Sequence, residues 1–248
     1  MEVEPNEPSG PEFGHLFPRT RTIWASVTGE TRAARVLSVS QLTARARHLF
    51  LENQIDLAIL SATIADSDVV QQPFWHPWCH VVAKAPEFAG PGEADVTVRT
   101  LEEEDLAVIV PLFAESLKAG LPENIQHRYS DRDLVDAATK RIEDVLARDS
   151  LAVVAGGGTA IRGFGLASNE TEFLHVHDIV VSGGAAGTGT GLALARYIEG
   201  FAYLRKLPEM RGTVSVSRLN NHERTLASLA SHGWKSVRFN FASLRSGL

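Results

Sequence analysis

The sequence predicts an α/β fold in which helices pack on a mixed α+β sheet. Short apolar or alternating segments, typical of strands, are interleaved with amphipathic helical segments along most of the chain. Glycine-rich turns join two strands at residues 156–158 and a strand to a helix at residues 183–191. The 248 residues are 44% hydrophobic and 22% charged, a composition that can bury a sizeable core without disulfide bonds.

Two breaks in the pattern divide the chain. Residues 1–18 carry several prolines and few apolar side chains, which predicts a flexible leader. Prolines and glycines at residues 86–92 interrupt any regular element and mark a boundary. We therefore expect two units, residues 19–90 and residues 91–248.

Each unit has its own order of elements. The N-terminal unit predicts a helix over 39–51, a strand over 56–63, a helical segment over 66–72 and a strand over 80–83. The C-terminal unit predicts strands over 96–99, 151–155, 160–167, 173–181, 213–216 and 236–241, with helices over 106–117, 131–148, 192–204 and 223–231. The first order repeats the last four elements of the second, so the N-terminal unit is interpreted as a shortened, diverged copy of the C-terminal one.

Composition excludes several classes of function. The single cysteine excludes a disulfide framework and a Cys-rich zinc site. No apolar run reaches the ~18 residues that span a bilayer, and the formal net charge of -6 gives no basic field for nucleic acid. We expect a soluble, cytoplasmic protein with no membrane or nucleic-acid partner and no metal. The oligomeric state stays open, a homodimer included.

The most informative segment is the glycine-rich stretch between a predicted strand and a predicted helix. Gly187, Gly189 and Gly191 let a ligand approach the backbone with no Cβ in the way. The first N–H groups of the following helix are unpaired and, together with the helix dipole, favour an anion such as a phosphate. A flexible connection is the alternative, but glycine at this density costs ~0.5–1 kcal/mol per residue in ordered elements.

Two common phosphate-binding motifs fit this segment poorly. A Walker loop requires a lysine after its last glycine, and the segment has none. The dinucleotide fingerprint Gly-x-Gly-x-x-Gly fails because these glycines stand two residues apart. A nucleotide-binding oxidoreductase is therefore disfavoured.

The segment resembles the pyrophosphate loop of the GNAT (Gcn5-related) N-acetyltransferase superfamily. That loop reads Gln/Arg-x-x-Gly-x-Gly/Ala, which would place it at residues 186–191, after an apolar triplet at residues 179–181. The element order over residues 96–241 and the helix between Asn220-Asn221 and Gly233-Trp234 resemble the family as well. One departure is that Ala186 replaces the Gln/Arg, which leaves main-chain N–H groups as the ligands.

The resemblance implies a GNAT-like acyl-CoA transferase fold preceded by a shortened, diverged GNAT-like unit. Acetyl-CoA would be the co-substrate, held where the fourth and fifth strands of the C-terminal unit splay apart. The residues implied to bind it are Ile179, Val180, Val181, Ala186, Gly187, Thr188, Gly189, Thr190, Gly191 and Asn221.

Two histidines are the candidate catalytic residues. His175 and His177 stand two apart on a predicted strand and should share a face, whereas Asp178 should point to the opposite face. An imidazole titrates near neutral pH and suits a general base. This His-x-His placement is similar to that of arylalkylamine N-acetyltransferases, where the pair relays a proton from the amine.

The general acid is not evident. Many GNAT enzymes carry a tyrosine four residues before the Gly-aromatic pair, and Leu229 occupies that position here. His222 and His232 are weaker candidates, and Tyr197 and Tyr203 are expected to pack or to cover CoA.

The resemblance predicts an N-acetyltransferase that moves an acetyl group directly from acetyl-CoA to an amine of a small molecule. The acceptor cannot be named from the sequence, although residues 118–130 should line its side of the cleft. Ala186 and Leu229 motivate an alternative, a catalytically weak acyl-CoA-binding or regulatory module.

Overall fold

The computed structural model describes most of the chain in side-chain detail. The described residues are 22–52, 54–55, 57–70, 74–88, 96–121, 129–157, 160–216 and 222–244. The predicted leader and Asn221 lie outside them, as does part of the predicted boundary at residues 86–92.

The elements agree with the predicted α/β class. The strands are β1 (Thr22–Ser26), β2 (Leu57–Thr63), β3 (His76–Lys84), β4 (Thr97–Thr100), β5 (Ser150–Gly157), β6 (Ala160–Asn169), β7 (Leu174–Val181), β8 (Met210–Ser215) and β9 (Lys235–Leu244). The helices are α1 (Arg32–Leu51), α2 (Leu106–Gly120), α4 (Asp131–Leu146), α5 (Thr190–Leu204) and α6 (His222–Ser231), with short 3₁₀ turns η1 (Ile64–Val70), η2 (Glu103–Asp105) and η3 (Gly183–Ala185). None of the helices in the described ranges is long and apolar enough to cross a bilayer.

The strands form one mixed sheet whose order contains an internal repeat. Over the described residues the order is β1-β2-β9-β3-β8-β7-β6-β5-β4. β1 and β2 run parallel with α1 between them in the chain, and β7 and β8 run parallel with α5 between them. The N-terminal repeat, β1-α1-β2-η1-β3, thus has the element order of the C-terminal repeat, β7-α5-β8-α6-β9, which confirms the shortened preceding copy.

The two repeats exchange their last strands. β3 of the N-terminal repeat pairs antiparallel with β8, and β9 of the C-terminal repeat pairs antiparallel with β2. β3 and β9 also pair with each other at the middle of the exchange. Each repeat therefore completes the sheet of the other, and the boundary between units stays a prediction.

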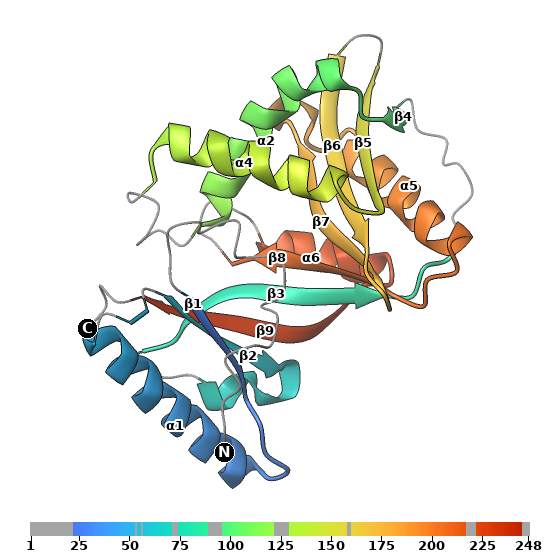
Figure 1. Cartoon of the computed structure of the whole chain (residues 1–248). Coiled ribbons are helices and arrows are strands. Elements are labelled where there is room, and N and C mark those ends of the chain that lie inside the picture. Colours follow the sequence, from blue (N-terminus) through green and yellow to red (C-terminus); the bar gives the residue numbers. More distant parts are fainter. Residues whose placement is uncertain are drawn as a thin grey trace.

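Three helical layers cover the sheet (Figure 1). α2 and α4 pack on one face of β5, β6 and β7, where the Phe113 and Phe164 rings stack edge to face at 5.4 Å. α5 packs on the opposite face of these strands through Leu194 and Ile198. α1 and η1 form a separate core with β2. Because both faces of β7 are covered, a ligand can reach its main chain only along an unpaired edge.

An ion pair fixes the start of α2 against the sheet edge. The Arg99 guanidinium on β4 donates two hydrogen bonds, of 2.6 and 2.8 Å, to the buried Asp105 carboxylate. The same carboxylate accepts from the Glu102 N–H at 2.9 Å. Hydrogen bonding to Arg99 holds the pKa of Asp105 below its usual value.

Candidate functional site

β7 and β8 separate after a short paired stretch. They pair in parallel only from Leu174 to Val176 of β7, whereas β7 stays paired with β6 up to Val181. β8 meanwhile stays paired with β3 up to Ser215. Figure 1 shows β7 running steeply away from β8, which lies across the view. The β8-facing edge of β7 from Ile179 to Val181 therefore has no strand partner among the described residues, and its main-chain N–H and C=O groups can pair with a ligand.

The predicted pantetheine-binding residues lie on this edge. Ile179, Val180 and Val181 each pair with β6 on one side and have no strand partner among the described residues on the other. The Val180 side chain is buried on the α2 and α4 face, and Ile179 packs toward the α5 face. Side-chain packing thus holds the backbone of this stretch in place, and the main-chain groups on the side away from β6 can form hydrogen bonds with a ligand.

The glycine-rich segment turns the end of β7 into α5. Gly187 and Gly189 have φ of +80° and +81°, and Gly189 is the N-cap of α5. A Cβ built on either residue would meet no atom within 4 Å, so the backbone conformation demands glycine while the space in front of it is open. The Thr188 hydroxyl donates to the Ala185 carbonyl at 2.7 Å and holds the turn in shape.

Several N–H groups at this turn have no protein acceptor. The N–H groups of Ala185, Ala186 and Thr188 close turns within the segment. Within the described part of the chain, no acceptor receives the N–H groups of Gly187, Gly189, Thr190 and Gly191. Unpaired N–H groups at the N-terminus of a 15-residue helix favour an anion, as the sequence predicted.

His175 and His177 lie side by side at the point where β7 leaves β8. Their ring centroids are 4.1 Å apart with an interplanar angle of 55°, and the residues are 2% and 8% exposed. The structure thus brings the two imidazoles together as predicted from their spacing. Their role in catalysis stays a prediction.

A β-bulge at His177 changes the faces of the residues that follow it. The register with β6 passes from Val176↔Ala167 directly to Asp178↔Leu166, which leaves His177 as the extra residue. Leu166 points into the core under α2 and α4. Asp178 therefore lies on the same side as His177, and the prediction that it faces the opposite side was wrong because the bulge breaks the alternation.

His177 belongs to a buried polar network that the sequence did not predict. Its Nδ1 lies 3.0 Å from Nη2 of Arg141 on α4, and its Nε2 lies 2.7 Å from Oγ of Ser168 on β6. The Ser168 hydroxyl donates to Oε1 of Glu170 at 3.0 Å. A signal did exist in the sequence, because Arg141 stands on the apolar side of its helix, three residues after the buried Ala138.

The remaining sequence candidates do not join this cluster. Asn221 lies outside the described residues. Leu229 packs against the core on the α5 face, so no hydroxyl stands at that position. His232 is exposed, with its Nδ1 2.7 Å from the Ser228 carbonyl. The candidate general acid thus stays unassigned.

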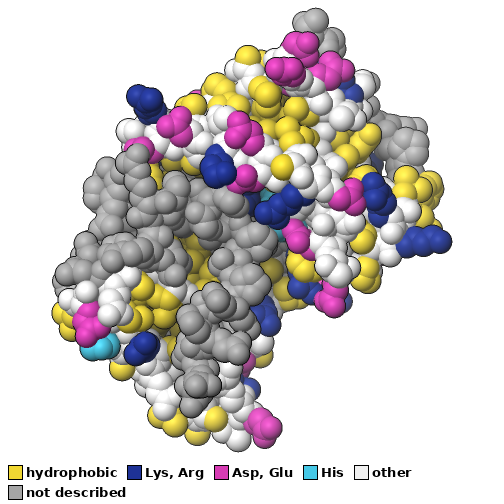
Figure 2. Space-filling model, in the orientation of Figure 1, with side chains coloured by type: hydrophobic (Ala, Val, Ile, Leu, Met, Phe, Trp, Pro, Cys, Tyr) yellow, Lys and Arg dark blue, Asp and Glu magenta, His cyan; other side chains and the backbone are white. Residues whose placement is uncertain are grey.

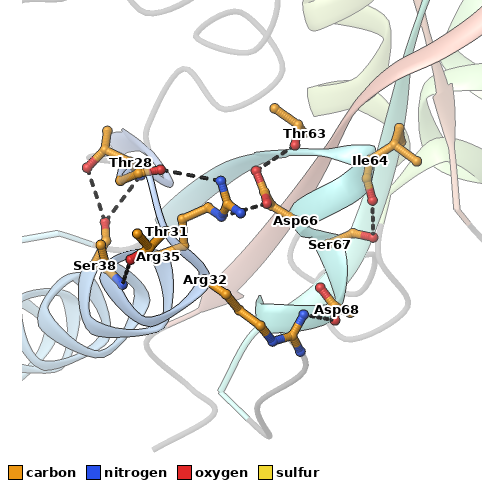
Figure 3. Close-up of polar contacts among 12 residues, drawn as sticks. Thr28, Thr31, Arg32, Arg35, Ser38, Thr63, Ile64, Asp66, Ser67 and Asp68 are labelled. Atoms are coloured by element: carbon orange, nitrogen blue, oxygen red, sulfur yellow. Dashed lines mark hydrogen bonds and ion pairs between the residues drawn. The ribbon is translucent and has the colours of Figure 1, made fainter.

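The N-terminal repeat lacks both features of the site. β1 and β2 stay paired along the whole length of β1, so these strands do not splay. The segment before α1 is closed, because the Thr31 side chain caps the Ala34 N–H and a Cβ on Gly29 would lie 2.8 Å from the Ala34 Cβ. Figure 3 shows Arg35 near this turn, paired with Asp66 at 2.8 Å. Among the described residues, only the C-terminal repeat has two parallel strands that separate next to helix N-terminal N–H groups without an acceptor.

A shallow pocket elsewhere on the molecule is a poor candidate. It is lined by Thr97, Arg99, Val154, Ala155, Gly156, Ala160 and Ile161. These residues belong to the ends of β4, β5 and β6, and none comes from β7 or the glycine-rich segment. Its one charged side chain, Arg99, is already paired with Asp105.

Solved structures resemble the chain over most of its length. An acetyltransferase from the GNAT family from Colwellia psychrerythraea matches with a TM-score of 0.55 and 13% identity, over 84% of this chain and 72% of that one. A GCN5-related N-acetyltransferase from Kribbella flavida matches with a TM-score of 0.53 and 10% identity, over 89% and 80%. The chain has the GNAT fold.

One solved structure resembles the chain over both repeats. A functionally unknown conserved protein from Staphylococcus epidermidis matches with a TM-score of 0.62 and 8% identity, over 98% of this chain and 96% of that one. No protein-family model matches the sequence, and no curated protein matches it either. The structural matches establish the GNAT fold, but at identities this low they do not establish the activity, which has to be argued from the site.

Proposed function

We propose that the chain transfers an acetyl group from acetyl-CoA to an amine of a small molecule. The observation that carries the proposal is the continuity of two features, the unpaired edge of β7 and the acceptor-free N–H groups at the start of α5. The edge suits the amide-containing pantetheine arm, and the N–H groups suit the diphosphate. Acetyl-CoA, when bound, supplies the acetyl group as a reactive thioester.

The residues that would hold the diphosphate are residues 186–191. Gly187 and Gly189 leave room for a group in direct contact with the main chain. Ala186 contributes no cationic side chain, so attraction rests on N–H groups and the helix dipole. We therefore expect CoA to bind more weakly than it would to a loop with Gln or Arg at this position.

One imidazole of the histidine pair supplies the proton acceptor. An amine is protonated at neutral pH and must lose its proton before its nitrogen attacks the thioester carbonyl. The new C–N bond then replaces the C–S bond, and CoA leaves as the thiol once protonated. His175 and His177 lie where β7 begins to separate from β8, next to the edge proposed for the pantetheine arm.

A small-molecule acceptor fits the described surface better than a nucleic acid. Acidic and basic side chains are interspersed over α4 on the face seen in Figure 2. Lys118 pairs with Asp131 and Lys140 with Asp144. Interspersed charges give no extended basic surface for a phosphate backbone.

A second candidate function is an acyl-CoA-binding module without turnover. Leu229 packs against the core where many GNAT enzymes would have a tyrosine hydroxyl, so this position offers no donor for the leaving thiolate. Water can protonate a thiolate, which keeps transfer as the preferred function.

One assay distinguishes the two functions. The purified chain is incubated with acetyl-CoA and a panel of primary amines, and the release of the CoA thiol is followed. We expect release that depends on both the protein and one class of amine. Thermal stabilisation by acetyl-CoA but not by NAD, without amine-dependent release, would support the binding module instead. No stabilisation by acetyl-CoA would contradict both.

A further inference from the structure

A chain of buried hydrogen bonds around His177 extends from α4 to the end of β6. Arg141, His177 and Ser168 are 7%, 8% and 0% exposed, so water does not screen their contacts. Arg141 is joined to His177, His177 to Ser168, and Ser168 to Glu170, at 3.0, 2.7 and 3.0 Å. Each of these distances is that of a normal hydrogen bond.

The hydrogen-bonding partners of His177 determine which of its two ring nitrogens carries the proton. A guanidinium only donates, so Nη2 of Arg141 donates to Nδ1 of His177, and that nitrogen carries no proton. The proton of a neutral imidazole then lies on Nε2 and is donated to Oγ of Ser168. The Ser168 hydroxyl is left to donate to the Glu170 carboxylate, as the structure has it. Each of these three contacts then joins one donor to one acceptor.

This arrangement opposes a second proton on His177. A proton on Nδ1 would face the donating N–H of Arg141 and would place two positive charges in contact in a buried site. Charged or titratable groups near the imidazole among the described residues include His175 on β7, Asp178, the next residue in the chain, and Glu170, which is joined to it through Ser168. Glu170 already lies 3.6 Å from the Arg148 guanidinium.

We propose that Arg141 is a positioning residue that keeps His177 neutral, with its proton on Nε2, and that His175 is the proton acceptor of the pair. The second half rests on the proposed acetyltransferase function, whereas the first half concerns only the folded chain. His177 then orients its neighbour, since the two ring centroids are 4.1 Å apart, and does not itself exchange a proton with the acceptor amine.

The first half is tested by NMR of the ¹⁵N-histidine-labelled chain without any ligand. Long-range ¹H–¹⁵N spectra should show a pyridine-like Nδ1 and a pyrrole-like Nε2 for His177, unchanged between about pH 8 and pH 5, where an ordinary imidazole titrates. The pattern should be lost or begin to titrate in Arg141→Met, with Lys140→Met, an exposed neighbour on α4, as the matched control. A wild-type His177 that takes up a second proton in this range, or carries its proton on Nδ1, would overturn the proposal even if Arg141→Met fails to fold.

The second half is tested by two single substitutions. Glutamine offers one acceptor and one donor and can stand in for the neutral imidazole between Arg141 and Ser168. We therefore expect His177→Gln to keep kcat within about 10-fold, and His175→Gln to lower it by about 100-fold or more, the usual contribution of a general base. The reverse order of effects would refute the assignment of His175. An inactive wild-type chain that passes the NMR test would leave Arg141 in its positioning role and would count against the acetyltransferase function alone.

Discussion

Replacing Gly189 by valine is expected to weaken CoA binding by about 100-fold, a loss of about 2.7 kcal/mol. Gly189 has φ of +81°, a conformation that a β-branched residue adopts only with strain. The valine side chain would also project into the open space in front of the segment, where no atom now lies within 4 Å. The backbone strain and the added side chain both disturb the N–H groups that we propose to bind the diphosphate.

Isothermal titration calorimetry with CoA measures this loss. The matched control is Gly200→Ala on α5, because Gly200 has no positive φ and an added Cβ meets no atom within 4 Å. Alanine favours a helix more than glycine does, so the control should keep the wild-type Kd and fold at least as stably. A folded Gly189→Val chain that binds CoA as tightly as the control would remove the diphosphate from this segment.

The double substitution His175→Gln/His177→Gln is expected to lower kcat by about 100-fold to 10⁴-fold while leaving the Kd for CoA nearly unchanged. Both side chains are buried beside the start of the splay, whereas the proposed CoA contacts are main-chain groups of β7 and the segment before α5. Losing the imidazoles therefore removes the proton acceptor, while the main-chain edge of β7 that we propose to bind CoA stays unchanged.

The pH–rate profile of the same variant adds an independent readout. The shape of the wild-type pH–rate profile should change in the variant, because removal of the general base leaves a residual rate that depends only on the concentration of unprotonated amine. A variant with the wild-type kcat and pH profile would show that the histidines are structural. A parallel loss of CoA affinity would show that they support the cleft rather than the chemistry.

The local elements could be predicted because their patterns are strong. Alternation and helical periodicity identified the strands and helices of the C-terminal part, and the glycine-rich segment indicated the turn into α5. β1 was missed because its five residues, Thr22–Ser26, do not alternate between apolar and polar side chains. α1 begins at Arg32, before the predicted residue 39, because its first turns are exposed and its start depends on the Thr31 cap.

The long-range features could not be read from local patterns. The exchange of β3 and β9 depends on pairing between residues more than 150 positions apart, such as Cys79 and Asn240. The bulge at His177 depends on the register with β6. The predicted side of Asp178 was therefore wrong, because it assumed that side chains alternate regularly along the strand. Arg141 reaches His177 only because α4 packs over β7 and β6, which a single helix cannot reveal.

The central claim is that the main-chain N–H groups between Gly187 and Gly191 bind the diphosphate of CoA. It is tested most directly by ¹H–¹⁵N spectra of the ¹⁵N-labelled chain with CoA and with pantetheine, which lacks the diphosphate. We predict that CoA shifts the amide signals of Gly187, Gly189 and Gly191, while pantetheine leaves them in place. Saturating CoA that moves none of these signals, or pantetheine that moves them equally, would contradict it.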